Sequence, residues 1–113
     1  MQRALVAAQL VEKHGISVRV IDLRTIIPYD WNMIAAAVQE TNRVIVAHED
    51  QLTCGFGAEI AARISEELFE YLEAPVTRIG AADTPVAYAP ELEEVILPQT
   101  DDLVRAIEKI AAY

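Results

Sequence analysis

The stretch RVIVAHEDQLTCGFGAEI, residues 43–60, decides the fold class of this chain. Its residues 44–47 form a short, continuous apolar run, which predicts a strand buried on both faces, as in a parallel sheet. Residues 49–57 are expected to form a loop, and a helix is expected to begin at about Ala58. The order of strand, loop and helix sets the pattern that the rest of the chain repeats.

Outward from this stretch, helices and strands continue to alternate. Asp30 is the predicted N-cap of a helix, because Trp31, Ile34 and Val38 follow it at the spacing of one helix face. Pro75 follows the end of the next helix, because proline cannot continue a helix. The predicted elements are a helix over 2–14, a strand over 18–23, a helix over 31–41, a strand over 44–47, a helix over 58–71, a strand over 76–79, an irregular segment over 80–99 and a helix capped by Thr100.

This alternation predicts the α/β class. We expect one domain over residues 1–113, a three-layer α/β/α sandwich with a mainly parallel sheet. Right-handed crossovers between parallel strands place helices on both faces of such a sheet.

The composition is acidic, with 18 Asp and Glu against 9 Lys and Arg and a net charge of −9. A surface of this charge repels phosphate backbones, so nucleic-acid binding is not expected. It either keeps the domain soluble or attracts a basic partner. No apolar run is long enough for a membrane span. With Cys54 as the single cysteine, no internal disulfide can form, and a reducing, cytoplasmic setting is expected.

Gly55 and Gly57 invite a binding interpretation, because they lie where a helix begins and backbone N–H groups there can bind an anion. The third glycine of a dinucleotide-binding motif is missing, so this interpretation is weak. Close approach of two backbones, either helix to sheet or chain to chain, is the favoured role of the glycines.

His48, Glu49 and Asp50 place a potential acid–base group at the end of a strand. An ordinary hydrogen-bonded loop histidine is the favoured interpretation, because no nucleophile other than Cys54 stands nearby. Two separated histidines and one cysteine do not have zinc spacing. We therefore assign no catalytic, cofactor-binding or metal-binding residue to this chain.

Together these segments resemble the transketolase C-terminal domain family. More narrowly, they are similar to the beta subunit of 2-oxo acid dehydrogenases, and the branched-chain (2-oxoisovalerate) type looks closer than the pyruvate type. The resemblance is carried by residues 20–28 (VIDLRTIIP), 43–49 (RVIVAHE), 55–60 (GFGAEI), 72–79 (LEAPVTRI) and 83–85 (DTP), and by the end at Tyr113.

The resemblance implies an assembly role. In that family thiamine diphosphate and Mg²⁺ are bound by other domains, and the parent enzyme decarboxylates a 2-oxo acid oxidatively and transfers the acyl group to lipoamide. The implied docking residues are Glu73 and Tyr113, facing the basic peripheral-subunit-binding domain of the acyltransferase. Contacts with an alpha subunit or preceding domains, and with a second beta copy, are implied for His48, Glu49, Gly55, Phe56 and Gly57. The implied location is the cytoplasm, or the mitochondrial matrix in a eukaryote.

The chain departs from the family pattern at its start. The family domain has further strands before the first helix, and one of them lies between the strands predicted here over 18–23 and 44–47. We therefore expect a piece of a larger subunit with an incomplete sheet and open strand edges. Two alternatives stay open: a stand-alone module that binds an anion or nucleotide at Gly55–Gly57, and the equivalent domain of a transketolase or related synthase.

Overall fold

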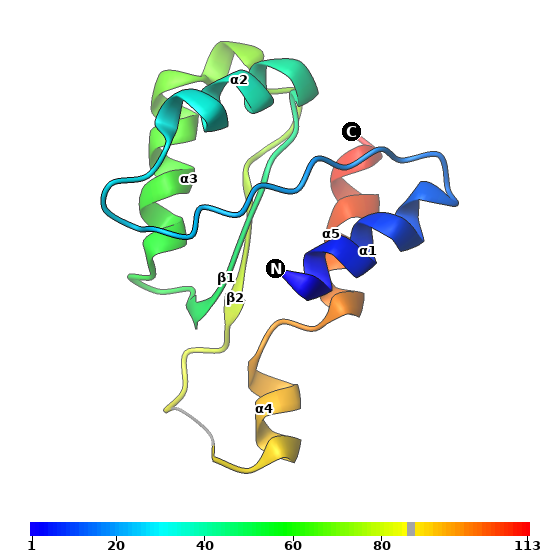
Figure 1. Cartoon of the computed structure of the whole chain (residues 1–113), viewed down its shortest axis with the longest axis vertical. Coiled ribbons are helices and arrows are strands. Elements are labelled where there is room, and N and C mark those ends of the chain that lie inside the picture. Colours follow the sequence, from blue (N-terminus) through cyan, green and yellow to red (C-terminus); the bar gives the residue numbers. More distant parts are fainter. Residues whose placement is uncertain (86–87) are drawn as a thin grey trace.

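The structure is a computed structural model that describes residues 1–85 and 88–113 (Figure 1). Residues 86–87, within the segment predicted to be irregular, lie outside this description. The elements are α1 (Gln2–Glu12), α2 (Trp31–Thr41), β1 (Ile45–Gln51), α3 (Phe56–Glu67), the 3₁₀ helix η1 (Phe69–Tyr71), β2 (Thr77–Ala81), α4 (Pro90–Ile96) and α5 (Thr100–Ala111).

The sheet of the described residues has two strands, β1 and β2, which pair in parallel. Ile45 lies opposite Thr77 and Ala47 lies opposite Ile79. The register then shifts, so that Gln51 lies opposite Ala81. The parallel pairing predicted from the apolar run is confirmed.

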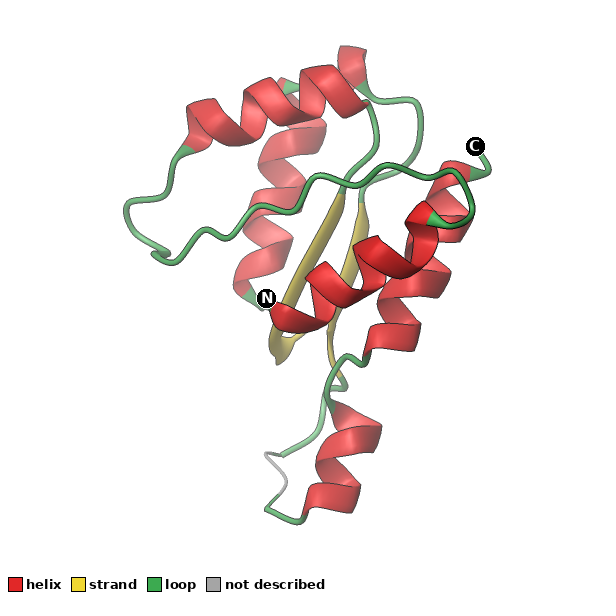
Figure 2. Cartoon of the chain, turned by 45° about the vertical axis from the view of Figure 1, so that its right-hand side comes forward, coloured by secondary structure: helices red, strands yellow, loops and turns green. Residues whose placement is uncertain are grey.

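Helices cover both faces of this sheet (Figure 2). Ile45 and Val46, being neighbours in a strand, point to opposite faces. Val46 packs on a cluster from α2 and α3, made of Ile34, Val38, Ile60, Ile64 and Leu68. Ile45 packs on a cluster from α1 and α5, made of Ala7, Val11, Leu103 and Ile107. The predicted three-layer α/β/α arrangement is therefore confirmed.

The strand predicted over residues 18–23 is wrong, because this segment is extended but belongs to no strand ladder of the described residues. Val18 packs on the cluster of α1 and α5, and Leu23 packs on the cluster of α2 and α3. Within the described part of the chain, no backbone group of residues 18–22 is bonded to another backbone group. The segment crosses the sheet as a coil (Figures 1 and 2), since no neighbouring strand supplies partners.

Further boundaries differ from prediction. β1 extends to Gln51, into the loop expected over 49–57, and α3 begins at Phe56 and not at about Ala58. The helix expected over 58–71 is divided into α3 and η1, with Leu68 between them. The segment expected to be irregular holds the end of β2 and the short helix α4, which begins at Pro90 because proline is favoured in a first helical turn. The N-cap of α5 is Gln99 and not Thr100, since Gln99 and Asp102 form a reciprocal capping box.

β1 is also less buried than predicted. Ala47 is exposed and Val46 is half-buried, because the edge of β1 away from β2 has no neighbour among the described residues. Among those residues, no helix is both long and apolar enough to cross a bilayer.

Candidate functional site

Arg43 organises the end of the sheet at which both strands begin. Its guanidinium pairs with the Glu73 carboxylate at 2.8 Å and donates to the main-chain oxygens of Ile110 at 3.2 Å and Tyr113 at 3.3 Å. Next to it, the Asn42 side-chain amide donates to the Tyr71 carbonyl at 2.8 Å. Arg43 therefore connects the start of β1, the segment before β2 and the end of α5.

The two predicted docking residues, Glu73 and Tyr113, are thus brought to one surface by the same arginine. Both are exposed, and the Glu73 side chain keeps 57% of its accessible area although it is paired. Sequence reasoning missed Arg43 and Asn42, which hold this surface together. The available signal was the turn at the end of α2, where Asn42 ends the helix in the left-handed conformation and directs Arg43 into the strand.

His48 organises the opposite end of the sheet. Its imidazole lies between two glycines at the start of α3 and one in β2, and a Cβ built on each would meet the ring: at 2.9 Å for Gly55, 2.4 Å for Gly57 and 2.9 Å for Gly80. The Cβ on Gly55 would also meet the Gln51 carbonyl at 2.0 Å. Gly55 and Gly57 therefore let the start of α3 come close to the His48 side chain and the Gln51 carbonyl of β1.

Only one ring nitrogen of His48 has a hydrogen-bond partner in the described structure. Nδ1 lies 3.0 Å from the Asp50 carbonyl, so it carries the proton and donates. Nε2 is buried and unpartnered. His48 lies within β1, so the prediction of a loop histidine is wrong about its position, while its ring is hydrogen-bonded through Nδ1 and packed against glycines.

The loop after β1 is held by side-chain bonds to the segment around and after β2. Arg78 donates to the Leu52 carbonyl at 2.9 Å. The Thr53 hydroxyl and its backbone N–H, the latter at 3.2 Å, both donate to the Asp83 carboxylate. Hydrogen bonds from Thr53, with a smaller contribution from the charge of Arg78, hold the pKa of Asp83 below its usual value.

The predicted subunit-contact residues have unequal access to solvent. Glu49 is exposed, His48 and Phe56 are half-buried, and Gly55 and Gly57 are buried. Phe56 turns inward, packing edge-to-face against Tyr29 with ring centres 5.8 Å apart. Of this set, only Glu49 presents an open side chain to another molecule.

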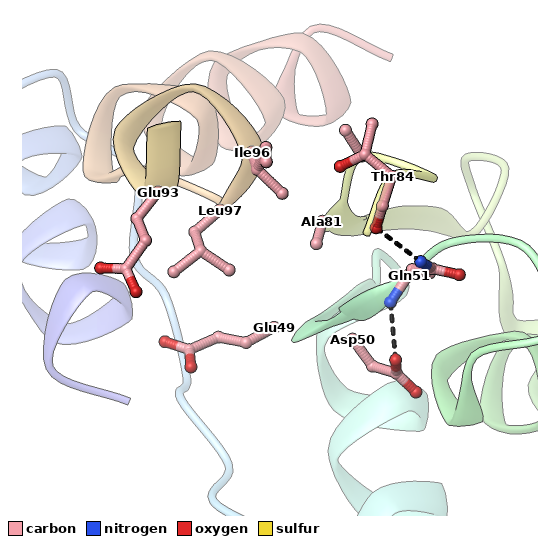
Figure 3. Close-up of a pocket in the computed structure, with 9 residues that line it drawn as sticks. Glu49, Asp50, Gln51, Ala81, Thr84, Glu93, Ile96 and Leu97 are labelled. Carbon is pink, nitrogen blue, oxygen red and sulfur yellow. Dashed lines mark hydrogen bonds between the residues drawn. The ribbon is translucent and has the colours of Figure 1, made fainter. Parts of the chain in front are cut away.

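Glu49 also borders a shallow pocket of about 220 Å³ between the ends of the strands and α4 (Figure 3). Its apolar walls come from Ala81, Ala82, Ile96 and Leu97. Three carboxylates, those of Glu49, Asp50 and Glu93, stand around it, and no lysine, arginine or histidine lines it. The pocket therefore has an apolar floor and an acidic border.

Thiamine diphosphate with Mg²⁺ does not fit the residues of this chain. A diphosphate at the start of α3 would need the space that the His48 ring occupies against Gly55 and Gly57. Within residues 1–85 and 88–113, no three potential metal ligands lie close enough together to hold an ion. We place no chemical step of a thiamine-dependent reaction on this chain.

Comparison with known proteins gives the class to which this fold belongs. The family profile described as "Transketolase, C-terminal domain" matches residues 1–103. A solved structure titled "Split gene transketolase, inactive beta4 tetramer" superposes with a TM-score of 0.80 at 29% identity, covering 98% of this chain and 35% of that chain. The chain belongs to the transketolase C-terminal domain family.

Within that family, proteins similar to this chain include beta subunits of pyruvate dehydrogenase. The beta-2 subunit of the mitochondrial E1 component from Oryza sativa subsp. japonica is 49% identical over 94% of this chain and 28% of its own length. The beta subunit of the E1 component from Rickettsia conorii is 41% identical over 97% of this chain and 34% of its own length. The chain thus spans about a third of the length of these relatives.

Proposed function

We propose that this chain is the C-terminal assembly domain of the beta subunit of a thiamine-diphosphate-dependent 2-oxo acid dehydrogenase. The observation that carries the proposal is the surface where Arg43 gathers Glu73 and Tyr113, on a domain similar to such subunits. The domain contributes surfaces to neighbouring chains, and the chemistry belongs to other domains.

The proposed partner at this surface is the basic peripheral-subunit-binding domain of the acyltransferase. Arg43 bonds one carboxylate oxygen of Glu73 and leaves the other available for a partner's cation. The end of α3 and η1 carry two further exposed carboxylates, Glu66 and Glu70. The acids of α4 lie at the other end of the molecule (Figure 1), so the two acidic groups do not form one patch.

Charge reversal of Glu73 in the full subunit tests this surface. We expect Glu73→Lys to weaken binding of the acyltransferase domain by about tenfold or more, because it places like charges opposite each other. Glu73→Gln removes the charge but keeps an oxygen that can accept a hydrogen bond from Arg43. It therefore tests whether docking depends on the charge of residue 73 or on the local contact with Arg43. Glu59→Lys, which makes the same charge change in the first turn of α3, is the control. Unchanged affinity in isothermal titration calorimetry for Glu73→Lys would remove this residue from the docking surface.

In the parent enzyme, thiamine diphosphate and Mg²⁺ are proposed to sit in the preceding domains, and the reaction is oxidative decarboxylation of a 2-oxo acid with acyl transfer to lipoamide. Calorimetry of the 113-residue chain with thiamine diphosphate is expected to give no binding heat. Turnover of the full enzyme with branched-chain 2-oxo acids and with pyruvate decides between the two substrate types. The cytoplasm of a bacterium or the mitochondrial matrix is the proposed location.

The open edge of β1 and the unpaired segment 18–23 support the proposal that the chain is part of a larger subunit. We propose that an upstream strand lies between them and satisfies their backbone groups. The exposed apolar residues of α1, namely Leu5, Val6 and Leu10, are then covered by the preceding domains, an alpha subunit or a second beta copy.

A second candidate is the equivalent domain of a transketolase, favoured by the structural likeness to a split-gene transketolase. The two candidates differ in the chemistry of the full protein. Acyl transfer to lipoamide from a 2-oxo acid supports the dehydrogenase, and transfer of a two-carbon unit between sugar phosphates supports the transketolase.

A further inference from the structure

The helix α4 presents an apolar surface that nothing in the described structure covers. Its residues Leu92 and Val95 are 56% and 81% exposed, and the adjacent Tyr88 is 97% exposed. None of the seven residues of α4 is buried. A helix of seven residues is not stable alone in water. The stability of α4 therefore depends on contacts at its ends and on contacts made by its apolar side chains.

The contacts at its carboxyl end fix the position of α4. The Ala82 backbone N–H donates to the Ile96 carbonyl at 3.0 Å. The Gln99 side-chain amide donates to the carbonyls of Glu94 at 3.1 Å and Leu97 at 3.0 Å. α4 is therefore held at one end while its apolar face stays open, as a preformed binding surface requires.

The charge around α4 indicates what kind of partner fits. Residues 79–104 contain no lysine, arginine or histidine, and they contain six acidic residues, namely Asp83, Glu91, Glu93, Glu94, Asp101 and Asp102. Figure 3 shows Glu93 and Glu49 extending toward the same space beside Ile96 and Leu97. An apolar floor with carboxylates at its border suits lysine or arginine, whose aliphatic stems pack on apolar groups while the charged end reaches the carboxylates.

We propose that α4 binds an apolar segment of a different protein subunit bordered by lysine or arginine, with Tyr88, Leu92 and Val95 contacting the apolar residues and the pocket of Glu49 and Glu93, on an adjacent side of the helix, contacting the cations. A second copy of this chain fits poorly, because each copy carries a net charge of −9 and would present carboxylates to carboxylates. The surface lies at the opposite end of the molecule from Glu73 and Tyr113 (Figure 1), so both can be occupied at once. The inference rests on the proposed function only in requiring that the full subunit assembles with other chains.

Photo-crosslinking in the assembled enzyme tests the occupant directly. A benzoylphenylalanine placed at Val95 of the full-length subunit, co-expressed with its partner subunits, is expected to crosslink to a different chain. Mass spectrometry is expected to find that crosslink within a segment of apolar residues flanked by lysine or arginine. The same probe at Phe69, which is 75% exposed at the other end of the molecule, is the control and is expected to crosslink elsewhere.

Crosslinks from Val95 to upstream residues of the same chain or to a second copy, or no crosslink in a complex that native mass spectrometry shows to be assembled, would overturn the proposal. A subunit that stays monomeric would overturn both this proposal and the proposed function. If the enzyme assembles and Glu73→Lys weakens acyltransferase binding, but Val95 forms no crosslink to a different chain, only the α4 proposal is overturned.

Charge substitutions give a second, independent measurement. Glu93→Lys is expected to weaken the affinity for the crosslinked subunit by about tenfold and to remove part of the salt dependence, while Glu93→Gln has a smaller effect. Glu40→Lys on α2 makes the same charge change away from α4 and is expected to leave this affinity unchanged. Equal affinities for Glu93→Lys and Glu40→Lys would contradict the assignment.

Discussion

Two apolar segments of similar composition adopt different secondary structure in this molecule. Residues 18–23 and 44–47 are both rich in branched residues, and both lie between the same two helical layers. The second segment enters β1 and pairs with β2, whereas the first remains an unpaired coil. The comparison teaches that a strand-forming sequence makes an extended backbone, but a neighbour with free N–H and C=O groups makes it a strand.

Supplying the neighbour should remove the difference. In the full-length subunit, we expect the amides of residues 19–23 to exchange with solvent about a thousandfold more slowly than in the 113-residue chain. The amides of β1 that face β2 are the internal reference, because they are paired in both forms. Hydrogen exchange measured by mass spectrometry or NMR gives both rates. Equal exchange of residues 19–23 in the two proteins would contradict an inserted strand.

The anchoring of β1 to α3 should be sensitive to one methyl group. A Cβ on Gly57 would lie 2.4 Å from the His48 ring and 3.3 Å from Val46. We expect Gly57→Ala to lower the free energy of unfolding by about 1–3 kcal/mol in urea denaturation, as overpacking does elsewhere. Adding His48→Ala should restore part of that loss, because the smaller side chain removes the clash. Full stability of the single variant would show that the ring can move aside.

Truncating one valine in each apolar segment to alanine should lower the free energy of unfolding by different amounts. Val46 packs on the cluster of α2 and α3, while Val20 belongs to neither cluster and borders a groove beside α1. Val46→Ala should cost about 2 kcal/mol of stability, and Val20→Ala less than about 1 kcal/mol. Thermal and urea unfolding of both variants measure the difference. A reversed order would mean that residues 18–23 are better packed than their contacts indicate.

The bonds that hold the loop after β1 should show in a titration. Since hydrogen bonds from Thr53 lower the pKa of Asp83, the ionised carboxylate stabilises the fold above the pKa of the unfolded state. That contribution should disappear as the pH falls through the lowered pKa. NMR titration of Thr53→Val should move the pKa of Asp83 upward, toward the value of a free aspartate. An unmoved pKa would assign the shift to the Thr53 backbone N–H and Arg78 instead of the hydroxyl.

The smallest effect is expected from the polar contact of the unpaired segment. Arg19 donates to the Glu40 carboxylate at 3.0 Å, and both side chains are exposed. Exposed pairs contribute little, so Arg19→Ala should change the free energy of unfolding by less than about 0.5 kcal/mol. A larger loss in urea denaturation would mean that this ion pair, and not apolar packing, places residues 18–23.

Local signals predicted much of the fold, because they act between residues close in the chain. Asp30 caps α2 by accepting from the Met33 N–H at 3.0 Å, and Asn42 ends the same helix, both as expected. The sandwich also followed from the alternation of apolar patterns. The segment over 18–23 could not be judged in this way, since its state depends on whether another segment pairs with it.

The candidate surfaces were predictable only in part, because their organising contacts join distant segments. Arg43 reaches residues 67 and 70 positions away, and no pattern around residue 43 indicates those partners. The role of Gly80 depends on the His48 ring, which lies on the neighbouring strand. The exposed face of α4 was missed because prolines at positions 85, 90 and 98 favoured an irregular segment.

The enclosure of the His48 ring also makes the fold sensitive to the register of β1. A slip of one residue along β1 would offer the methyl group of Ala47 or the charged side chain of Glu49 to a space shaped for an imidazole. The first would leave a void and the second would bury an unpaired charge. The fit of the His48 side chain therefore favours one register of β1 relative to β2 and α3.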